Sequence, residues 1–159
     1  MAYDFTTAAN SVEEFWMPFT PQRLFKKAPR MVVRASGMYY YDENNKPILD
    51  AAAGMWCVNA GHDQPKVKEA IKAQLDLLDF APAFQFGHPT VFKAASRVIA
   101  GMPKAYTHVF FSNSGSEAVD TALKMALAYH RIKGDGTRRT LIGRERAYHG
   151  VGFGGISVG

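Results

Sequence analysis

The chain has 159 residues, of which 47% are hydrophobic and 21% charged, and its net charge is +5. These values are typical of a soluble globular protein and exclude intrinsic disorder and collagen-like architectures. The longest apolar run, residues 51–58, is far shorter than the roughly twenty residues that span a bilayer, so we expect no membrane protein. With one cysteine, Cys57, and no secretory signal at the N-terminus, the sequence excludes an internal disulfide and favours a cytoplasmic protein.

The positive charge does not favour a nucleic-acid-binding protein. The basic residues occur in short groups that alternate with acidic residues, and no recognised nucleic-acid motif accompanies them. A modest excess of this kind suits acidic small substrates or a partner surface.

The N-terminal third predicts an arm followed by a small sheet. Residues 11–14 have the spacing of a capping box and predict a short helical turn, which Pro18 and Pro21 end. Further on, aromatic and β-branched runs separated by turn residues predict antiparallel strands. The expected strands are residues 31–34, 38–41 and 48–49.

Two amphipathic helices are predicted next. Asp63 can cap the first, which has Pro65 in its first turn and apolar residues at helical spacing up to Leu78. The second begins at His88, and Gly101 closes it. Both patterns predict helices with one buried face.

The last third predicts a strand, a long helix and a second strand. The expected strands are residues 107–111 and 139–142, and the helix between them is apolar apart from one polar face. This order is typical of a parallel sheet, so we predict an α/β fold. Eight of the fourteen glycines lie from Gly134 onward, and because a domain rarely ends on such a loop we expect the N-terminal part of a longer protein.

A Ser/Gly turn joins the first of these strands to the long helix. The first backbone N–H groups of a helix lack partners, and with the helix dipole they form an anion site. Gly115 lets the backbone approach a ligand closely, while Ser114 and Ser116 add hydroxyl donors. The residues alone leave two interpretations open, a phosphate site or serines that only cap the helix.

Other motifs of nucleotide and hydrolase chemistry are missing or incomplete. The sequence has no P-loop and no G-x-S-x-G. Residues 150–155 match G-x-G-x-x-G, but no clean strand precedes them and no helical pattern follows, as a dinucleotide site requires. The histidines, Met55 and Cys57 have no metal-ligand spacing, so we expect no metal.

Several longer segments carry a family pattern. They are residues 50–54, 61–62, 113–118, 121–124 and 146–150. In these segments the chain resembles the class III aminotransferases, enzymes of fold type I that use pyridoxal 5'-phosphate (PLP). Within that family it is most similar to the ω-amino acid–pyruvate, or β-alanine–pyruvate, aminotransferases, through residues 15–20, 54–62 and 84–89.

The resemblance assigns the Ser/Gly turn to the cofactor. It implies that the backbone N–H groups of Gly115 and Ser116, with the Ser116 hydroxyl, hold the PLP phosphate beside Ser114. Tyr148 matches the aromatic residue that stacks on the pyridine ring, where an offset π contact suits an electron-poor ring. His149 is expected to shape the turn that presents Tyr148. Without the resemblance, Tyr148 is an ordinary half-buried tyrosine.

Aromatic residues are implied to line the substrate pocket. Phe19, Trp56 and Tyr148 match pocket positions, and Phe86 lies in a segment, residues 84–87, that matches a loop reaching the neighbouring subunit's active site. Rigid aromatic walls suit amines that lack a carboxylate next to the reacting carbon, since shape must hold them. Taken singly, each aromatic residue is better explained by core packing.

The resemblance also implies groups that these 159 residues lack. The family places its Schiff-base lysine and the acid that pairs with the pyridinium nitrogen downstream, so no catalytic residue is assigned here. Lys124 cannot substitute, because it lies about 12 Å along the helix axis from the turn. We therefore expect residues 1–60 to form an N-terminal arm with part of a small domain, and residues 61–159 to begin a large, mostly parallel-sheet PLP domain.

For the whole protein the resemblance implies ping-pong transfer of an amino group from a primary amine, such as β-alanine, to pyruvate. The expected assembly is a homodimer or dimer of dimers with its active site at the subunit interface. Three alternatives stay open: a decarboxylase or aminomutase of the same fold, a nucleotide-binding module built on residues 150–155, and a fragment with no catalytic role of its own.

Overall fold

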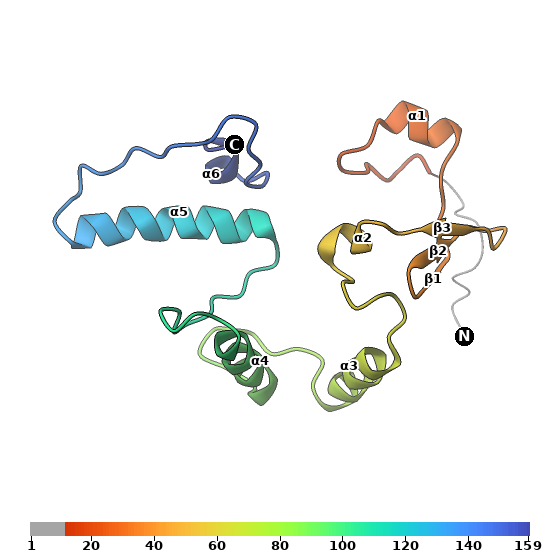
Figure 1. Cartoon of the computed structure of the whole chain (residues 1–159), viewed down its shortest axis with the longest axis horizontal. Helices are drawn as coiled ribbons and strands as arrows, with labels where there is room; N and C mark the ends of the chain where they lie inside the picture. The colour runs from red at the N-terminus through yellow and green to blue at the C-terminus, as the bar shows by residue number, and fades with distance from the viewer. Residues whose placement is uncertain (1–11) are drawn as a thin grey trace. The chain divides into compact units, whose positions relative to one another are not determined.

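The computed structural model describes residues 12–159 (Figure 1). These residues divide after Ala81 into two compact units, of which the second is Pro82–Gly159. The domain division expected at residue 60 stays a prediction.

The first helix of the first unit is α1, Gln22–Lys27, which the sequence analysis did not predict. The helical turn expected earlier is wrong in its described part, because residues 12–14 form a bend, and Ser11 lies outside the described residues. A capping box without an apolar periodic run after it does not offset the cost of helix nucleation. Helix α1 follows Pro21, whose φ of −68° suits a helix start.

The predicted antiparallel sheet is confirmed. Strand β2, Tyr39–Tyr41, pairs with β1, Arg34–Ser36, on one side and with β3, Pro47–Leu49, on the other. The first strand begins three residues later than expected. Gly37, at φ 58°, makes the first turn, and its N–H and C=O pair with the backbone of His62 in an antiparallel bridge.

After the sheet comes α2, Ala53–Trp56, a single turn of unusual hand. All four residues have positive φ, from 49° at Ala53 to 71° at Trp56. Left-handed backbone costs a non-glycine residue about 1–2 kcal/mol, so Ala53, Met55 and Trp56 are all strained. The amides of Cys57 and Val58 both donate to the Ala53 carbonyl at 2.9 Å, which closes the turn.

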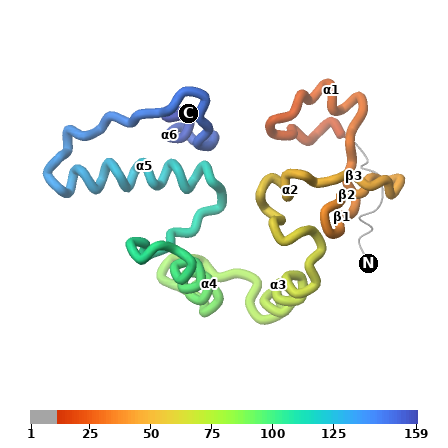
Figure 2. Tube along the Cα trace, in the orientation of Figure 1, coloured from red at the N-terminus to blue at the C-terminus, as the bar shows by residue number. Residues whose placement is uncertain are grey.

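Three longer helices follow, where the periodicity predicts them. They are α3, Pro65–Leu77, α4, Pro89–Ala100, and α5, Gly115–Ile132. The predicted cap of α3 is wrong, because Gln64 holds the N-cap position and the Asp63 carboxylate pairs with Lys68 at 2.5 Å. Figure 2 shows the trace returning from the end of α5 to α6, Phe153–Ile156, which contacts α5.

The two predicted strands that flank α5 are absent, because residues 107–111 and 139–142 form neither a helix nor a paired strand within the described part of the chain. A parallel strand exists only beside a neighbour that completes its ladder of hydrogen bonds. These two segments therefore have the composition of β-strands, but no neighbouring strand pairs with them in the described part of the chain.

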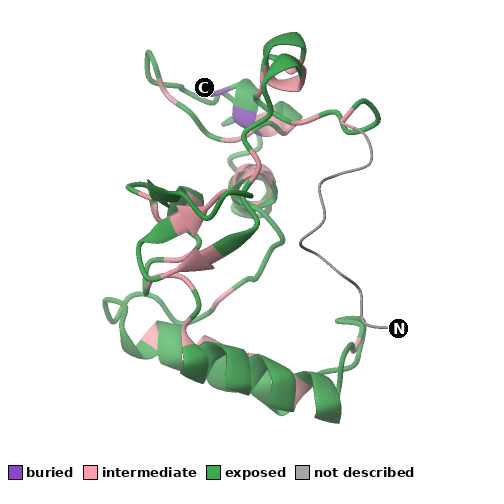
Figure 3. Cartoon of the chain, turned by 90° about the vertical axis from the view of Figure 1, so that its right-hand side faces the viewer, coloured by how far each residue is buried: buried purple, intermediate pink, exposed green. Residues whose placement is uncertain are grey.

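Almost all of the described residues are accessible to solvent. Among them only Gly155 and Val158 are buried, both at the α6 end of the second unit (Figure 3). The helix faces expected to be buried are uncovered, as Ile71 of α3 shows with 54% exposure. No helix among residues 12–159 has the length and apolarity needed to cross a membrane.

Candidate cofactor and substrate site

The start of α5 is capped by its own side chains. Ser114 is the N-cap, and its Oγ accepts a hydrogen bond from the Glu117 N–H at 3.1 Å. In return, Glu117 Oε2 accepts from the Asn113 N–H at 3.0 Å. This reciprocal arrangement is close to a capping box. The capping interpretation therefore describes Ser114.

Gly115 and Ser116, the two residues after this cap, have backbone N–H groups that can donate to a ligand. Within the described part of the chain, no group accepts from the N–H of Gly115 or Ser116, which are the first two residues of α5. No heavy atom lies within 4 Å of the position that a Cβ on Gly115 would take, so the space beside it is open. Ser116 Oγ accepts from the Val151 N–H at 2.9 Å, which leaves its own proton free to donate.

A glycine-rich segment, residues 150–155, docks on this end of α5. Gly150, at φ 96°, lies so close that a Cβ there would be 2.7 Å from Ser116 Cα. A Cβ on Gly152 would overlap the Asp120 carboxylate, and Asp120 Oδ1 accepts from the Gly155 N–H at 2.9 Å. The glycines thus allow close packing on a helix, which explains the pattern that resembled a dinucleotide motif.

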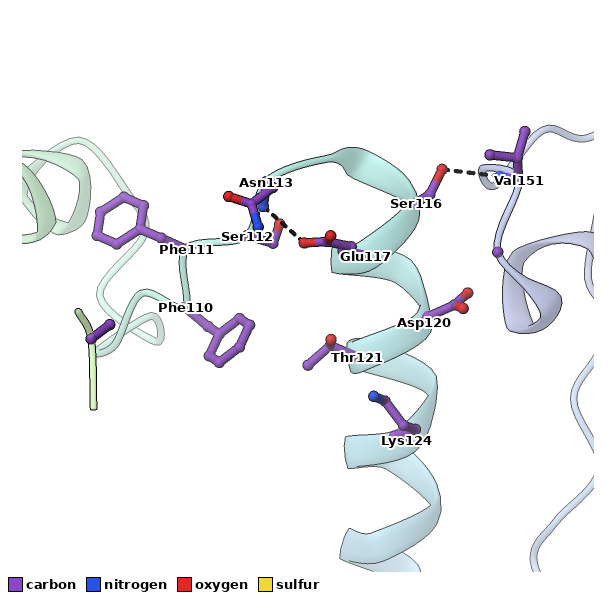
Figure 4. A pocket seen from close by; sticks show the side chains of 12 residues that line it. Phe110, Phe111, Ser112, Asn113, Ser116, Glu117, Asp120, Thr121, Lys124 and Val151 are labelled. Atoms are coloured by element: carbon purple, nitrogen blue, oxygen red, sulfur yellow. Dashed lines mark hydrogen bonds between the residues drawn. The ribbon is translucent and has the colours of Figure 1, made fainter. Parts of the chain in front are cut away.

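The docked segment borders an open cavity of about 790 Å³. Its walls are the segment 110–113, one side of the first turns of α5, and Val151 with Gly152 (Figure 4). Lys124 lines the same cavity as Asp120, which agrees with the predicted polar face. The cavity lies wholly in the second unit.

Tyr148 and His149 precede the docked segment directly. The Tyr148 side chain is 69% exposed, so it is not part of a core. The His149 carbonyl packs against Gly155, and Gly150 makes the positive-φ bend between them. The structure therefore brings the backbone that carries Tyr148 against Ser116, although these two residues are 32 apart in sequence.

The other predicted pocket residues are also exposed aromatic side chains. Phe86, in the second unit, is 72% exposed, while Phe19 and Trp56, in the first unit, are 84% and 76% exposed. Core packing, the structural alternative for each of them, does not occur within the described chain. The strained turn α2 carries Trp56.

A carboxylate that sequence reasoning gave no role holds this turn. Asp50 Oδ1 accepts from the Ala52 N–H at 3.1 Å, and Oδ2 accepts from the Gly54 N–H at 2.7 Å. His62 Nε2 lies 2.7 Å from the same Oδ2, and Tyr40 also bonds to Asp50. The Asp50 side chain is only 6% exposed. Asp50 and His62 belong to matching family segments, and that was the only signal in the sequence.

These contacts shift two pKa values. Burial acts to raise the pKa of Asp50, but the hydrogen bonds from His62, Ala52 and Gly54 outweigh burial and lower it. The pKa of Tyr40 is raised, first by burial and then by the negative charge of Asp50. Asp50 is therefore a carboxylate at neutral pH.

A family model described as "Aminotransferase class-III" matches residues 22–159. The chain belongs to the class III aminotransferases. This confirms the family that the sequence segments indicated.

Relatives of known name agree with this assignment. An omega-aminotransferase of Caulobacter vibrioides is 60% identical over 95% of this chain and 34% of its own length. The beta-alanine–pyruvate aminotransferase of Pseudomonas aeruginosa is 44% identical over 91% of this chain and 32% of its own length. The chain thus spans about a third of the length of these relatives.

A solved structure also matches. An amine transaminase from an uncultivated Pseudomonas species, in its PLP-bound form, superposes with a TM-score of 0.84 and 38% identity, over 94% of this chain and 34% of that chain. Its fold is that of the type I PLP-dependent transferases, which confirms the predicted fold class. Class III aminotransferases use PLP, and the open, donor-rich start of α5 fits the phosphate of that cofactor.

Proposed function

We propose that the whole protein is a PLP-dependent aminotransferase that moves an amino group from an ω-amino acid or another primary amine to pyruvate. One observation carries the proposal: the Val151 N–H donates to Ser116 Oγ at 2.9 Å. This bond docks the segment after Tyr148 against a helix start whose first N–H groups are available. The names of the two relatives support the amine and the acceptor.

In this proposal the residues of the second unit hold the cofactor. The N–H groups of Gly115 and Ser116 and the Ser116 hydroxyl donate to the phosphate, while Ser114 fixes the helix end as its cap. Tyr148 stacks on the pyridine ring, and His149 shapes the bend before the docked segment. Bound PLP acts as an electron sink for chemistry at the amine carbon.

Aromatic side chains define the amine pocket in the proposed enzyme. Phe19, Trp56, Phe86 and Tyr148 offer large exposed apolar surfaces, which bind an amine by shape and exclude water. Lys124 lies two turns into α5, too far from the Ser/Gly turn, and in keeping with the family resemblance we place the catalytic lysine outside these 159 residues. We further propose a cytoplasmic homodimer or dimer of dimers with its active site at the subunit interface.

The full-length protein tests this proposal. We expect added PLP to give a visible absorption band, and β-alanine with pyruvate to yield alanine. Borohydride treatment followed by peptide mapping identifies the lysine to which the cofactor becomes fixed. A lysine within residues 1–159, or none, would refute the site assignment. Carbon dioxide release, or an isomerised amine without alanine, would instead indicate a decarboxylase or an aminomutase.

A further inference from the structure

The carboxylate of Asp50 holds the start of the turn α2. Asp50 Oδ1 accepts from the N–H of Ala52, the residue just before the turn, and Oδ2 accepts from the N–H of Gly54 within it. His62 and Tyr40 complete the set of donors around the same side chain, and their rings lie 4.4 Å apart. The Asp50 side chain thus joins the start of this turn to His62, and it is only 6% exposed.

The turn needs such an anchor because its backbone is unfavourable. Ala53, Met55 and Trp56 have φ of 49°, 57° and 71°, a region that residues with a Cβ avoid. The one glycine, Gly54, has no room for a Cβ, because Val58 and the Tyr40 hydroxyl lie 3.0 and 3.2 Å from its position. A nearly buried carboxylate that accepts from two backbone amides at the start of the turn opposes the relaxation of this strain.

The turn displays its side chains outward. Met55 and Trp56 are 65% and 76% exposed, while the side of Gly54 that would carry a Cβ faces Val58 and the Tyr40 hydroxyl. The backbone angles at Trp56 therefore set where its side chain leaves the chain, and packing around the indole contributes little within this unit.

We propose that Asp50 is a positioning residue that holds the left-handed turn Ala53–Trp56 and so fixes Trp56 as a wall of the amine pocket. His62 supports it by holding Oδ2 in place through Nε2. The inference rests on the proposed function for the role of Trp56, but the link between Asp50 and the turn is independent of it.

A double-mutant cycle in the full-length protein tests the proposal. The variants are Asp50→Asn, Trp56→Ala and the pair, with Asp42→Asn as the matched control. Asp42 also accepts from two backbone amides, those of Asn44 and Lys46, but it supports a hairpin that carries no pocket residue. The measurements are hydrogen exchange of residues 52–58, PLP content, and kcat and KM for benzylamine and β-alanine.

We expect Asp50→Asn to speed exchange of residues 52–58 and to raise KM for benzylamine about tenfold, the upper range for loss of one aromatic contact. PLP content and kcat should change little. In the Trp56→Ala background the same substitution should leave KM unchanged, because its effect passes through the indole. Asp42→Asn should alter none of these values.

The opposite results would overturn the proposal. These are unchanged exchange in Asp50→Asn, or a KM effect that adds fully to that of Trp56→Ala. If Asp50→Asn does not fold, His62→Gln carries the same comparison, since it keeps both amide contacts and should shift exchange and KM in the same direction by less. If the wild-type protein transfers no amino group, the proposed function fails and hydrogen exchange alone decides on Asp50.

Discussion

The turn at Trp56 and the segment after Tyr148 are both held by side chains that accept from backbone amides, but their backbones differ. In the first unit, Asp50 accepts from the amides of a turn that presents Trp56. In the second, Ser116 and Asp120 of α5 accept from the amides of a segment that follows Tyr148. In both cases a polar side chain accepts hydrogen bonds from the backbone of a segment next to or within which an exposed aromatic residue lies.

The difference lies in what makes each loop possible. In the docked segment, residues 150–155, glycines occupy the positions where a Cβ would clash with Ser116 or Asp120 of α5. Among these residues only Gly150 has positive φ. Around Asp50, three residues with side chains adopt positive φ, and a nearly buried carboxylate holds them there. In the segment on α5, glycine lets two backbones approach closely without strain. In the turn Ala53–Trp56, charge-assisted hydrogen bonds stabilise a strained backbone whose residues carry side chains.

The largest expected effect breaks the close packing on α5. Gly150→Ala places a Cβ 2.7 Å from Ser116 Cα at a φ of 96°, so the clash and the backbone strain together should destabilise the full-length protein by about 2–4 kcal/mol. Urea unfolding measures this loss. Gly136→Ala is the control, because no heavy atom lies within 4 Å of its Cβ position, and a loss there as large as at Gly150 would contradict the packing argument.

Substitutions of two serines in the same turn distinguish the role of helix cap from the proposed contact with the cofactor. Ser116→Ala should weaken PLP binding by about tenfold or more, because a hydrogen bond to a charged group is worth about 1.5–3 kcal/mol. Ser114→Ala should lower stability by about 1 kcal/mol through loss of the cap, with little change in PLP affinity. Equilibrium PLP titration and urea unfolding measure the two effects. Equal loss of PLP affinity in both variants would show that the two serines share one role.

The carboxylate anchor predicts a pH dependence of known sign. Since the folded-state pKa of Asp50 is lowered from 3.8, its ionised form stabilises the fold above that pH, and this contribution is lost as the pH falls through the lower value. The thermal midpoint of the wild type should thus exceed that of Asp50→Asn by its largest amount at pH 6, and this difference should shrink below pH 4. A difference that grows on acidification would exclude the anchor.

The smallest expected effect relieves the strain directly. Met55→Gly suits a φ of 57°, and because glycine also gains freedom in the unfolded chain, the net gain in stability should be only about 0.5–1 kcal/mol. A thermal shift assay measures it. Gly54→Ala, which has the same φ and no room, should be destabilising, and stabilisation by both variants would contradict the described turn.

Local signals in the sequence predicted much of the fold. The three-stranded sheet and helices α3, α4 and α5 were correct, because turn residues and apolar periodicity act within short stretches of chain. Helix α1 was missed and the turn after Ser11 misplaced, since a six-residue helix has too little pattern to distinguish it. The strands at residues 107–111 and 139–142 carry the right composition, but pairing depends on neighbours that local composition does not specify.

The candidate site divides in the same way. The sequence by itself determined the donor-rich start of α5, because the Ser/Gly turn and the helix that follows are local features. Only the tertiary structure showed that Gly150 and Gly152 pack against Ser116 and Asp120, and that Asp50 meets His62. Such contacts join residues 12 to 35 positions apart, and positive φ at residues such as Met55 opposes their intrinsic preference. They exist because tertiary hydrogen bonds and close packing outweigh local backbone energies.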